Sequence, residues 1–211
     1  IYTPPQIESE IRDLLKNLEN YINNFEDETD PLIKMAMIHY QFESIHPFYD
    51  GNGRTGRILN VLYLVLSGLL DSPILYLSNY INKNKSDYYR LFNEFREKNN
   101  YEDWIIYILK GIQETSKNTI DLIKMIQEEM ELYRNKFREE LPKVYSDELL
   151  DALFFEVYTK INYIESKCGV TRQTAASYLN QLVDKGLLDY EKVGRESIYK
   201  NTRLISLLRK F

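Results

Sequence analysis

The fold is decided by residues 45–57, which read Ile45-His46-Pro47-Phe48-Tyr49-Asp50-Gly51-Asn52-Gly53-Arg54-Thr55-Gly56-Arg57. The stretch lies between two apolar segments with helical patterns, and it holds a histidine, a carboxylate, three glycines and two arginines. No other part of the sequence is as specific. We expect a connection between two helices that carries a functional site.

The glycines and arginines predict a phosphate seat. Gly51 and Gly53 lack a Cβ, so the backbone can adopt a positive φ and bring successive N–H groups close to an anion. Residues 54–67 have a helical pattern, and the N-terminus of a helix attracts the same anion. Arg54 and Arg57 fall on one helical face, where guanidinium groups can bind phosphate oxygens through two parallel hydrogen bonds.

His46 and Asp50 add a candidate base and a candidate metal ligand to this phosphate seat. A histidine has an unperturbed pKa of about 6.5, so His46 can act as a neutral general base. Asp50 supplies the hard oxygen ligand that a divalent cation shared with phosphates prefers. Base, metal ligand, anion seat and arginines together indicate phosphoryl or nucleotidyl transfer. The simpler alternative is a glycine-rich turn with ordinary charges.

Three other motifs fit the same residues less well. Residues 51–56 satisfy G-x-G-x-x-G, but a helical segment precedes them where the dinucleotide fingerprint needs a strand. A calcium loop starting at Asp50 would place Arg54 at its fifth position and Val61 at its twelfth. A P-loop would need lysine at Arg57.

A zinc site is a further alternative, because His39, Glu43 and His46 share one helical face. Such a site usually needs further ligands, and the chain has two histidines and one cysteine in all. We expect His39 to be structural and Glu43 to orient a neighbouring group.

Residues 46–57 resemble, without a mismatch, the active-site motif H-P-F-x-D-G-N-G-R-x-x-R of the Fic-domain family. That family moves AMP from ATP onto a Ser, Thr or Tyr hydroxyl of a target protein, with Mg²⁺. The resemblance implies a protein adenylyltransferase that performs AMPylation, and its target can be the chain itself. The kinase-like Doc toxins carry lysine where Gly53 stands, so the motif favours nucleotidyl transfer.

The resemblance also implies a role for each position. His46 would be the base that deprotonates the target hydroxyl, Asp50 the magnesium ligand and Phe48 a buried anchor for the loop. The phosphates of ATP would be held by Gly51, Asn52, Gly53, Arg54 and Arg57.

Residues 74–91 resemble the Fic core as well, where a tyrosine pair lies near the adenine. Tyr88 and Tyr89 are therefore candidates for stacking on the base. Packing between helices is an equally good interpretation of both side chains.

Composition limits the class of protein. The 211 residues carry a formal net charge of −5, which argues against binding nucleic acid through bulk charge. The single cysteine, Cys168, fits a reducing compartment. The longest apolar run, residues 58–70, is too short to span a bilayer and predicts a buried helix. We expect a cytoplasmic protein with no membrane contact.

The helical patterns predict a mainly α fold in two domains. Residues 1–140 form a Fic-like helical catalytic domain, with an N-cap at Asp30, proline at the first helical position and a long helix over 102–139. Glycine at position 68 is expected to end the helix that follows the motif.

Residues 141–211 predict a small winged helix-turn-helix domain of the α+β class. We expect helices over 147–161, 162–168 and 171–185, then strands over 187–192 and 196–200. From Asp147 onward there are ten Lys and Arg against nine Asp and Glu, a net charge of +1. Because phosphate contacts need clustered positive charge, protein interaction or homodimer formation is favoured over DNA binding.

Family members with a proline-rich entry like residues 2–5 normally carry an inhibitory helix with an S/T-x-x-x-E-G/N motif, and a β-hairpin flap. No Ser or Thr here begins that motif. We expect both parts to be missing, which leaves open a fragment or one piece of a longer protein, and we expect ATP to bind without their restraint. The alternative function is a nucleotide-binding regulatory or scaffolding protein whose winged helix binds DNA or a protein partner.

Overall fold

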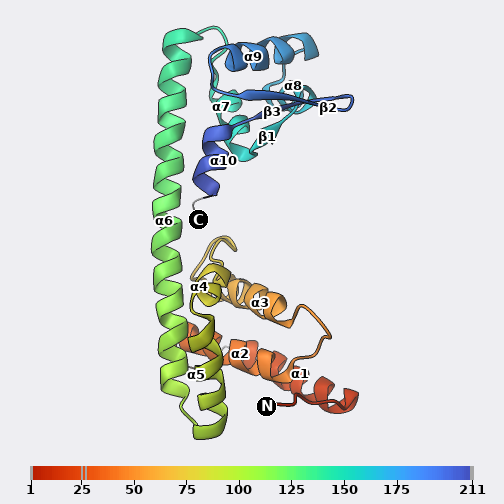
Figure 1. Ribbon diagram of the computed structural model, residues 1–211, viewed down its shortest axis with the longest axis vertical. Coiled ribbons are helices and arrows are strands. Elements are labelled where there is room, and N and C mark those ends of the chain that lie inside the picture. Colours follow the sequence, from red (N-terminus) through yellow and green to blue (C-terminus); the bar gives the residue numbers. More distant parts are fainter. Residues whose placement is uncertain (1, 25, 27, 210–211) are drawn as a thin grey trace. The chain divides into compact units, whose positions relative to one another are not determined.

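The computed structural model describes residues 2–24, 26 and 28–209. The chain divides into two compact units, Ile1–Thr119 and Ile120–Phe211, each with its own hydrophobic core. The division falls within one long helix, α6 (Tyr101–Glu140), which is visible in Figure 1 and extends one residue beyond the predicted 102–139 at each end. The predicted division after residue 140 assigns this whole helix to the first domain, whereas the contacts divide it between both units.

The N-terminal unit is built on two helices that are packed together, α1 (Glu8–Ile22) and α2 (Pro31–Ile45). The predicted start of α2 is confirmed, because the Asp30 carboxylate accepts a hydrogen bond from the Leu32 N–H at 2.8 Å and Pro31 fills the first helical position. α2 is buried on several sides and ends at Ile45, directly before the motif histidine.

Helix α3 (Asn52–Leu66) follows the motif loop and packs against α2. Its predicted end is confirmed, since Gly68 has a φ of 72° and donates its N–H to the Val65 carbonyl at 3.0 Å. The prediction that residues 58–70 are a buried helix is only half right. One face is buried, but Ile58, Leu62 and Leu66 recur every four residues on a face that is half-exposed.

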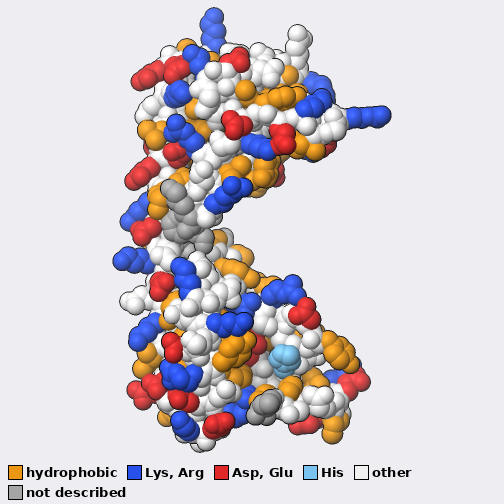
Figure 2. All heavy atoms as spheres, in the orientation of Figure 1, with side chains coloured by type: hydrophobic (Ala, Val, Ile, Leu, Met, Phe, Trp, Pro, Cys, Tyr) orange, Lys and Arg blue, Asp and Glu red, His pale blue; other side chains and the backbone are white. Residues whose placement is uncertain are grey.

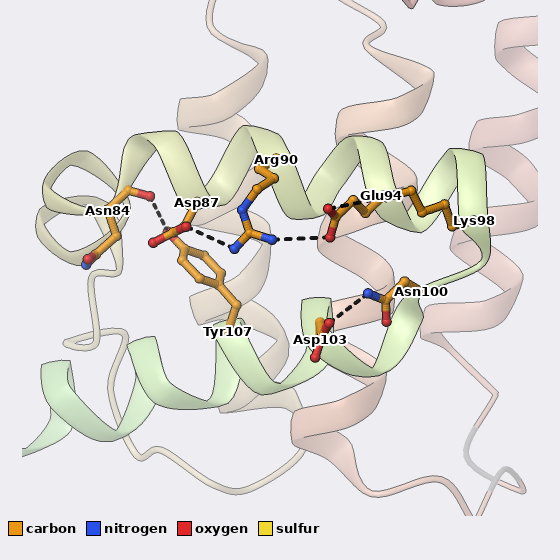
Figure 3. Close-up of polar contacts among 8 residues, drawn as sticks. All are labelled: Asn84, Asp87, Arg90, Glu94, Lys98, Asn100, Asp103 and Tyr107. Atoms are coloured by element: carbon orange, nitrogen blue, oxygen red, sulfur yellow. Dashed lines mark hydrogen bonds and ion pairs between the residues drawn. The ribbon is translucent and has the colours of Figure 1, made fainter.

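Helices α4 (Ser78–Lys83) and α5 (Lys85–Lys98) follow in this unit, and Figure 3 shows α5 with the start of α6. The Tyr107 hydroxyl of α6 donates to the Asn84 carbonyl at 3.3 Å, just before α5 begins. α6 is tied to α2 by Trp104, which is fully buried and donates its indole N–H to the Ala36 carbonyl at 2.9 Å.

The same view shows a row of charges on α5, in which Arg90 bridges Asp87 at 3.0 Å and Glu94 at 3.2 Å. Half-exposed ion pairs of this kind contribute little to stability. The arrangement of α4, α5 and α6 therefore depends on the buried aromatic side chains.

The C-terminal unit contains the end of α6 and a small antiparallel sheet in the strand order β1-β3-β2 (Figure 1). Its further elements are α7 (Asp147–Phe155), β1 (Tyr158–Thr159), α8 (Ile161–Cys168), α9 (Arg172–Asp184), β2 (Asp189–Val193), β3 (Glu196–Lys200) and α10 (Thr202–Leu208). The predicted mainly α fold with a helix–turn–helix pair and a hairpin is confirmed.

Two local predictions in this unit fail. The helix predicted over 147–161 is wrong, because α7 ends at Phe155 and Tyr158 then pairs with Lys200 on β3. A β3 edge that would otherwise be open takes up this short aromatic and β-branched segment as a strand. α10 was not predicted. Its start depends on Asn201, which is 2% exposed and accepts a hydrogen bond from the Leu204 N–H at 3.0 Å.

None of the helices in the described part of the chain is long and apolar enough to cross a membrane.

Candidate functional site

His46 is set at the point where α2 stops. It adopts the left-handed conformation with φ 49° and ψ 57°, and its N–H donates to the Phe42 carbonyl at 3.0 Å. A non-glycine residue in this conformation is uncommon and is held there by its surroundings. The left-handed turn releases the chain from the helix and leaves the imidazole exposed.

Asn52, the first residue of α3, holds the motif loop from inside. Its side-chain amide accepts a hydrogen bond from the Phe48 N–H at 2.9 Å and donates one to the Phe48 carbonyl at 2.6 Å. The same amide nitrogen lies 3.1 Å from Nδ1 of His46. It also lies 3.3 Å from Nε2, so the amide nitrogen contacts both nitrogens of the ring. Asn52 therefore contacts both the loop backbone and the His46 ring.

The prediction that Phe48 is a buried anchor is wrong, since its side chain is 50% exposed and its ring centroid lies 6.4 Å from that of Phe42. The loop is anchored by the Phe48 backbone, whose N–H and carbonyl both bind Asn52. Sequence patterns report side-chain hydrophobicity and give no direct signal for this backbone role.

Asp50 and Arg54 bind each other across the start of α3. One Asp50 oxygen accepts the Gly51 N–H at 2.7 Å, and the other accepts Nη2 of Arg54 at 3.0 Å. Both side chains are largely exposed, so this ion pair is weak and either partner can turn to a ligand.

A magnesium ion is compatible with this carboxylate. Among the residues that the structure describes, no three His, Cys, Asp or Glu side chains are close enough to form a metal site, so neither the zinc alternative nor an all-protein metal site is supported. Mg²⁺ is commonly held by one or two carboxylates together with phosphate oxygens and water. The donor set around Asp50 fits that mode.

The motif borders a cavity of about 570 Å³ in the N-terminal unit. Five predicted site residues line it: His46 directly after α2, Gly53 and Arg57 on α3, and Tyr88 and Tyr89 on α5. The other four, Asp50, Gly51, Asn52 and Arg54, do not line its walls and form the loop and first helical turn beside it. The cavity therefore joins His46, Arg57 and the tyrosine pair.

The two tyrosines differ in environment. Tyr88 is 8% exposed and packs against Trp104, with ring centroids 5.3 Å apart, so most of its surface belongs to the core. Tyr89 is 55% exposed at the cavity, with Nζ of Lys85 at 5.8 Å from its ring centroid. Of the pair, Tyr89 has the ring face that is free to stack on a base.

Several cavity residues were not predicted, and they come from distant parts of the chain. Tyr2 donates its hydroxyl to the Ser44 carbonyl at 2.8 Å, and the Arg96 guanidinium lies 3.3 Å from the Tyr2 ring centroid. Both line the cavity. No local pattern joins the start of the chain to the end of α5, so the sequence alone does not predict that Tyr2 and Arg96 form a wall of the cavity.

Tyr76 was also missed, and it lies beside the arginines of the motif. The Ser78 hydroxyl, and after it the Arg57 guanidinium, lower the pKa of Tyr76. The ring is half-exposed, so its hydroxyl is accessible to a ligand.

Two ionisable groups of α2 have shifted pKa values: Glu43, which lines the cavity, and His39, which is fully buried. Burial raises the pKa of Glu43 to about 7, although the Arg57 charge opposes this shift. Burial, reinforced by Arg57, lowers the pKa of His39 to about 4. His39 has no exposed surface and its Nε2 lies 3.1 Å from the Tyr88 hydroxyl, in agreement with the structural role expected for it.

Comparison with known proteins assigns parts of the chain to two family models. Residues 1–64 match the model of the Fic/DOC family. This part of the chain is similar to the Fic/DOC family. Residues 130–204 match a second model, described as the C-terminal domain of SoFic-like protein adenylyltransferase. The two matches leave out residues 65–129, which contain the end of α3, α4, α5 and most of α6.

Individual relatives agree with this assignment. A probable protein adenylyltransferase of Aquifex aeolicus is 39% identical over 79 residues, which are 37% of this chain and 23% of the relative. The protein adenylyltransferase fic-1 of Caenorhabditis elegans is 39% identical over 59 residues, which are 28% of this chain and 12% of the relative. The matched segments thus span less than a quarter of each relative.

A solved structure resembles the fold. The crystal structure of a Fic family protein from Desulfovibrio desulfuricans superposes with a TM-score of 0.51 at 20% identity, and the match covers 95% of this chain and 57% of that one. At this identity the likeness concerns the fold alone. The Fic helical bundle followed by a small C-terminal domain is therefore shared.

Proposed function

We propose that the Fic domain transfers AMP from ATP to a Ser, Thr or Tyr hydroxyl of a protein. The observation that carries this proposal is that His46, Gly53 and Arg57 line one cavity while Asn52 contacts the His46 ring and holds the motif loop. The names of the relatives, which are protein adenylyltransferases, support the same reaction.

In the proposed reaction the target hydroxyl oxygen forms a bond to the α-phosphorus of ATP. The bond from that phosphorus to the bridging oxygen breaks, and pyrophosphate leaves. His46 takes the hydroxyl proton, as a neutral imidazole can at physiological pH. Arg57 and Arg54 bind the β- and γ-phosphates, whose charge grows as pyrophosphate departs.

Asp50 would hold Mg²⁺, which supplies charge neutralisation for the phosphates when it is bound. For Asp50 and Arg54 to act on ATP, their mutual ion pair at 3.0 Å must open. Opening this ion pair costs little free energy, because exposed ion pairs contribute about 1 kcal/mol or less. The free thiol of Cys168 supports a cytoplasmic location, where thiols stay reduced.

The second candidate is a nucleotide-binding regulatory or scaffolding protein that performs no transfer. It is favoured by the engagement of Asn52 and Arg54 with the loop itself, which leaves the phosphate seat partly occupied by protein groups. The two candidates differ in whether a covalent adduct forms.

Labelled ATP separates the candidates. The full chain is incubated with Mg²⁺ and ATP labelled at the α- or the γ-phosphate, alone and with lysate proteins, and label on protein is measured. AMP transfer places only the α-label on protein, and His46→Ala abolishes it while calorimetry still detects ATP binding. Transfer of the γ-label, or transfer that survives His46→Ala, contradicts the proposal.

The mass of the adduct identifies the nucleotide and the modified side chain. Parallel incubations with CTP, UTP and GTP test the nucleotide preference in the same experiment. ATP binding with no adduct in any mixture would favour the scaffolding candidate.

A further inference from the structure

A second cavity, of about 370 Å³, lies within the C-terminal unit. It is formed by the first residues of α8, the first residue of α9 and the β2–β3 hairpin, which is called the wing below. Four basic side chains line it: Lys160, Arg172, Lys192 and Arg195. Figure 2 shows Lys and Arg side chains projecting around the end of the wing.

Most of this positive charge is not neutralised. Lys160 pairs with Glu196 at 2.7 Å. Arg172, Lys192 and Arg195 take part in no ion pair or side-chain hydrogen bond within residues 2–24, 26 and 28–209. Three free cations from α9, β2 and the wing turn therefore converge on one cavity.

Other cations of the same unit are engaged. Lys185 pairs with Glu140 at 3.0 Å, Arg203 pairs with Glu129 at 2.9 Å, and Lys200 pairs with Glu191. The small net charge of the module thus conceals a local excess of positive charge. The net charge counted over the sequence does not reveal this cluster, because only the fold brings its members together.

The exposed face of α9 beside the cavity suits a nucleic acid. Leu179 and Leu182 point into the core, whereas Arg172, Gln173 and Ser177 are exposed. The first carboxylate of α9 is Asp184, its last residue. In helix–turn–helix domains the N-terminal residues of the second helix contact base edges, and arginine, glutamine and serine are suitable side chains.

The N-terminus of α8 is suited to bind a phosphate. Lys160 precedes this helix without capping it through a side-chain hydrogen bond, so the first N–H groups are available at the cavity. Helix N-termini and basic side chains are the usual partners of backbone phosphates, which position a protein on a duplex.

From these observations we propose that the C-terminal unit binds double-stranded DNA. The cavity seats a backbone phosphate among Arg172, Lys192 and Arg195, and the N-terminal half of α9 faces the major groove. A B-form duplex is required, because the deep and narrow major groove of double-stranded RNA does not admit a helix. The proposal is independent of AMP transfer.

The test measures binding of the full chain to a fluorescent DNA duplex of about 20 base pairs by anisotropy, at several KCl concentrations. Three phosphate contacts give a slope of about −2.7 in log affinity against log salt, which is about 40-fold weaker binding at 200 mM than at 50 mM. The variant R172Q/K192Q/R195Q should lose nearly all of that slope and of the affinity at low salt.

A charge-matched control is K124Q/K143Q/R209Q, which removes three exposed cations of the same unit away from the cavity. It should keep most of the affinity and slope. Equal loss in both variants would mean that only net charge matters and would overturn the proposal, as would the absence of salt-sensitive binding by the unmodified chain.

Competitors distinguish other anions. Unlabelled duplex DNA should displace the probe, whereas inorganic phosphate at the same phosphate concentration should not, since a duplex presents several phosphates and the groove together. If polyglutamate displaces the probe as well as duplex DNA does, the cavity binds an acidic polypeptide and the DNA proposal fails. Preferential competition by duplex RNA would also contradict it.

Discussion

At the scale of single residues, Glu43 and His39 give the N-terminal unit two opposed responses to pH. The Glu43 pKa of about 7 exceeds its unfolded value of 4.5, so its contribution to stability is present below pH 4.5 and lost as pH rises to 7. The His39 pKa of about 4 is below its unfolded value of 6.5, so its contribution is present above pH 6.5 and lost as pH falls to 4. Between pH 4.5 and 6.5 the two slopes oppose each other.

In Glu43→Gln, the pH dependence of stability should be the one that His39 alone produces. Without the carboxyl group, the free energy of unfolding should increase by about 1.4 kcal/mol per pH unit between pH 4.5 and 6.5, because only the unfolded chain then binds a proton at His39. Denaturant titration at a series of pH values measures this slope. Glu97→Gln, at an exposed position, should leave the profile of the unmodified chain unchanged. Parallel profiles for Glu43→Gln and the unmodified chain would contradict the opposed pair.

Arg57→Gln should weaken nucleotide binding. A hydrogen bond to a charged group contributes about 1.5–3 kcal/mol, so the dissociation constant for ATP with Mg²⁺ should rise about 10- to 100-fold. Calorimetric titration measures the change. Arg12→Gln removes an exposed arginine that pairs with Glu8 on α1 and should leave the affinity as it was. Unchanged affinity in Arg57→Gln would remove that arginine from the site.

At the scale of elements, α2 and α3 approach closely at Gly56. A Cβ there would lie 2.6 Å from Oε1 of Glu43 and 3.3 Å from Cδ1 of Phe42. The absence of a side chain at this position therefore allows the close spacing between the helix that ends before His46 and the helix that begins at Asn52.

Gly56→Ala should destabilise the N-terminal unit by about 1–3 kcal/mol through overpacking, and it should also weaken ATP binding because the Glu43 carboxylate, which lines the cavity, must shift. Gly111→Ala is the matched control, since its Cβ would lie 2.7 Å from the Tyr80 ring, away from the cavity. The control should lose stability and keep ATP affinity, as measured by thermal unfolding and calorimetry. Loss of affinity in both variants would show that general destabilisation is responsible.

Elements with local signals could be predicted from the sequence, and those that depend on distant partners could not. The Asp30 cap, the Gly68 end of α3 and the wing hairpin are each specified within a few residues. In contrast, β1 exists because Tyr158 and Thr159 meet β3, some forty positions later. The motif residues of the site could be predicted because they are neighbours in the sequence. The cavity wall formed by Tyr2 and Arg96 could not be predicted, because these residues are far apart in the sequence.

At the scale of the whole molecule, each unit has a core of its own, and α6 contributes to both. Trp104 and Ile108 lie in the first core, and Tyr133 and Phe137 in the second. In the described chain no residue from 113 to 132 is fully buried. We therefore expect the cores to respond separately to mutation.

Leu150→Ala should destabilise the C-terminal unit by about 2–5 kcal/mol, because Leu150 has no exposed surface. ATP binding to the N-terminal unit should persist at low temperature. Scanning calorimetry should show one transition shifted and another retained. Ile108→Ala in the first core is the reciprocal control and should shift the other transition. A single transition that moves equally in both variants would show that the units unfold as one.

The two histidines of the chain differ completely in accessibility, since His39 has no exposed surface and His46 is exposed. A reagent selective for imidazole, such as diethyl pyrocarbonate, should therefore modify His46 alone in the folded protein. The same contrast should give two separate imidazole resonances, of which only one responds to added nucleotide. The protein thus carries a built-in reporter group, and occupancy of its cavity can be followed by chemical footprinting without a label being introduced.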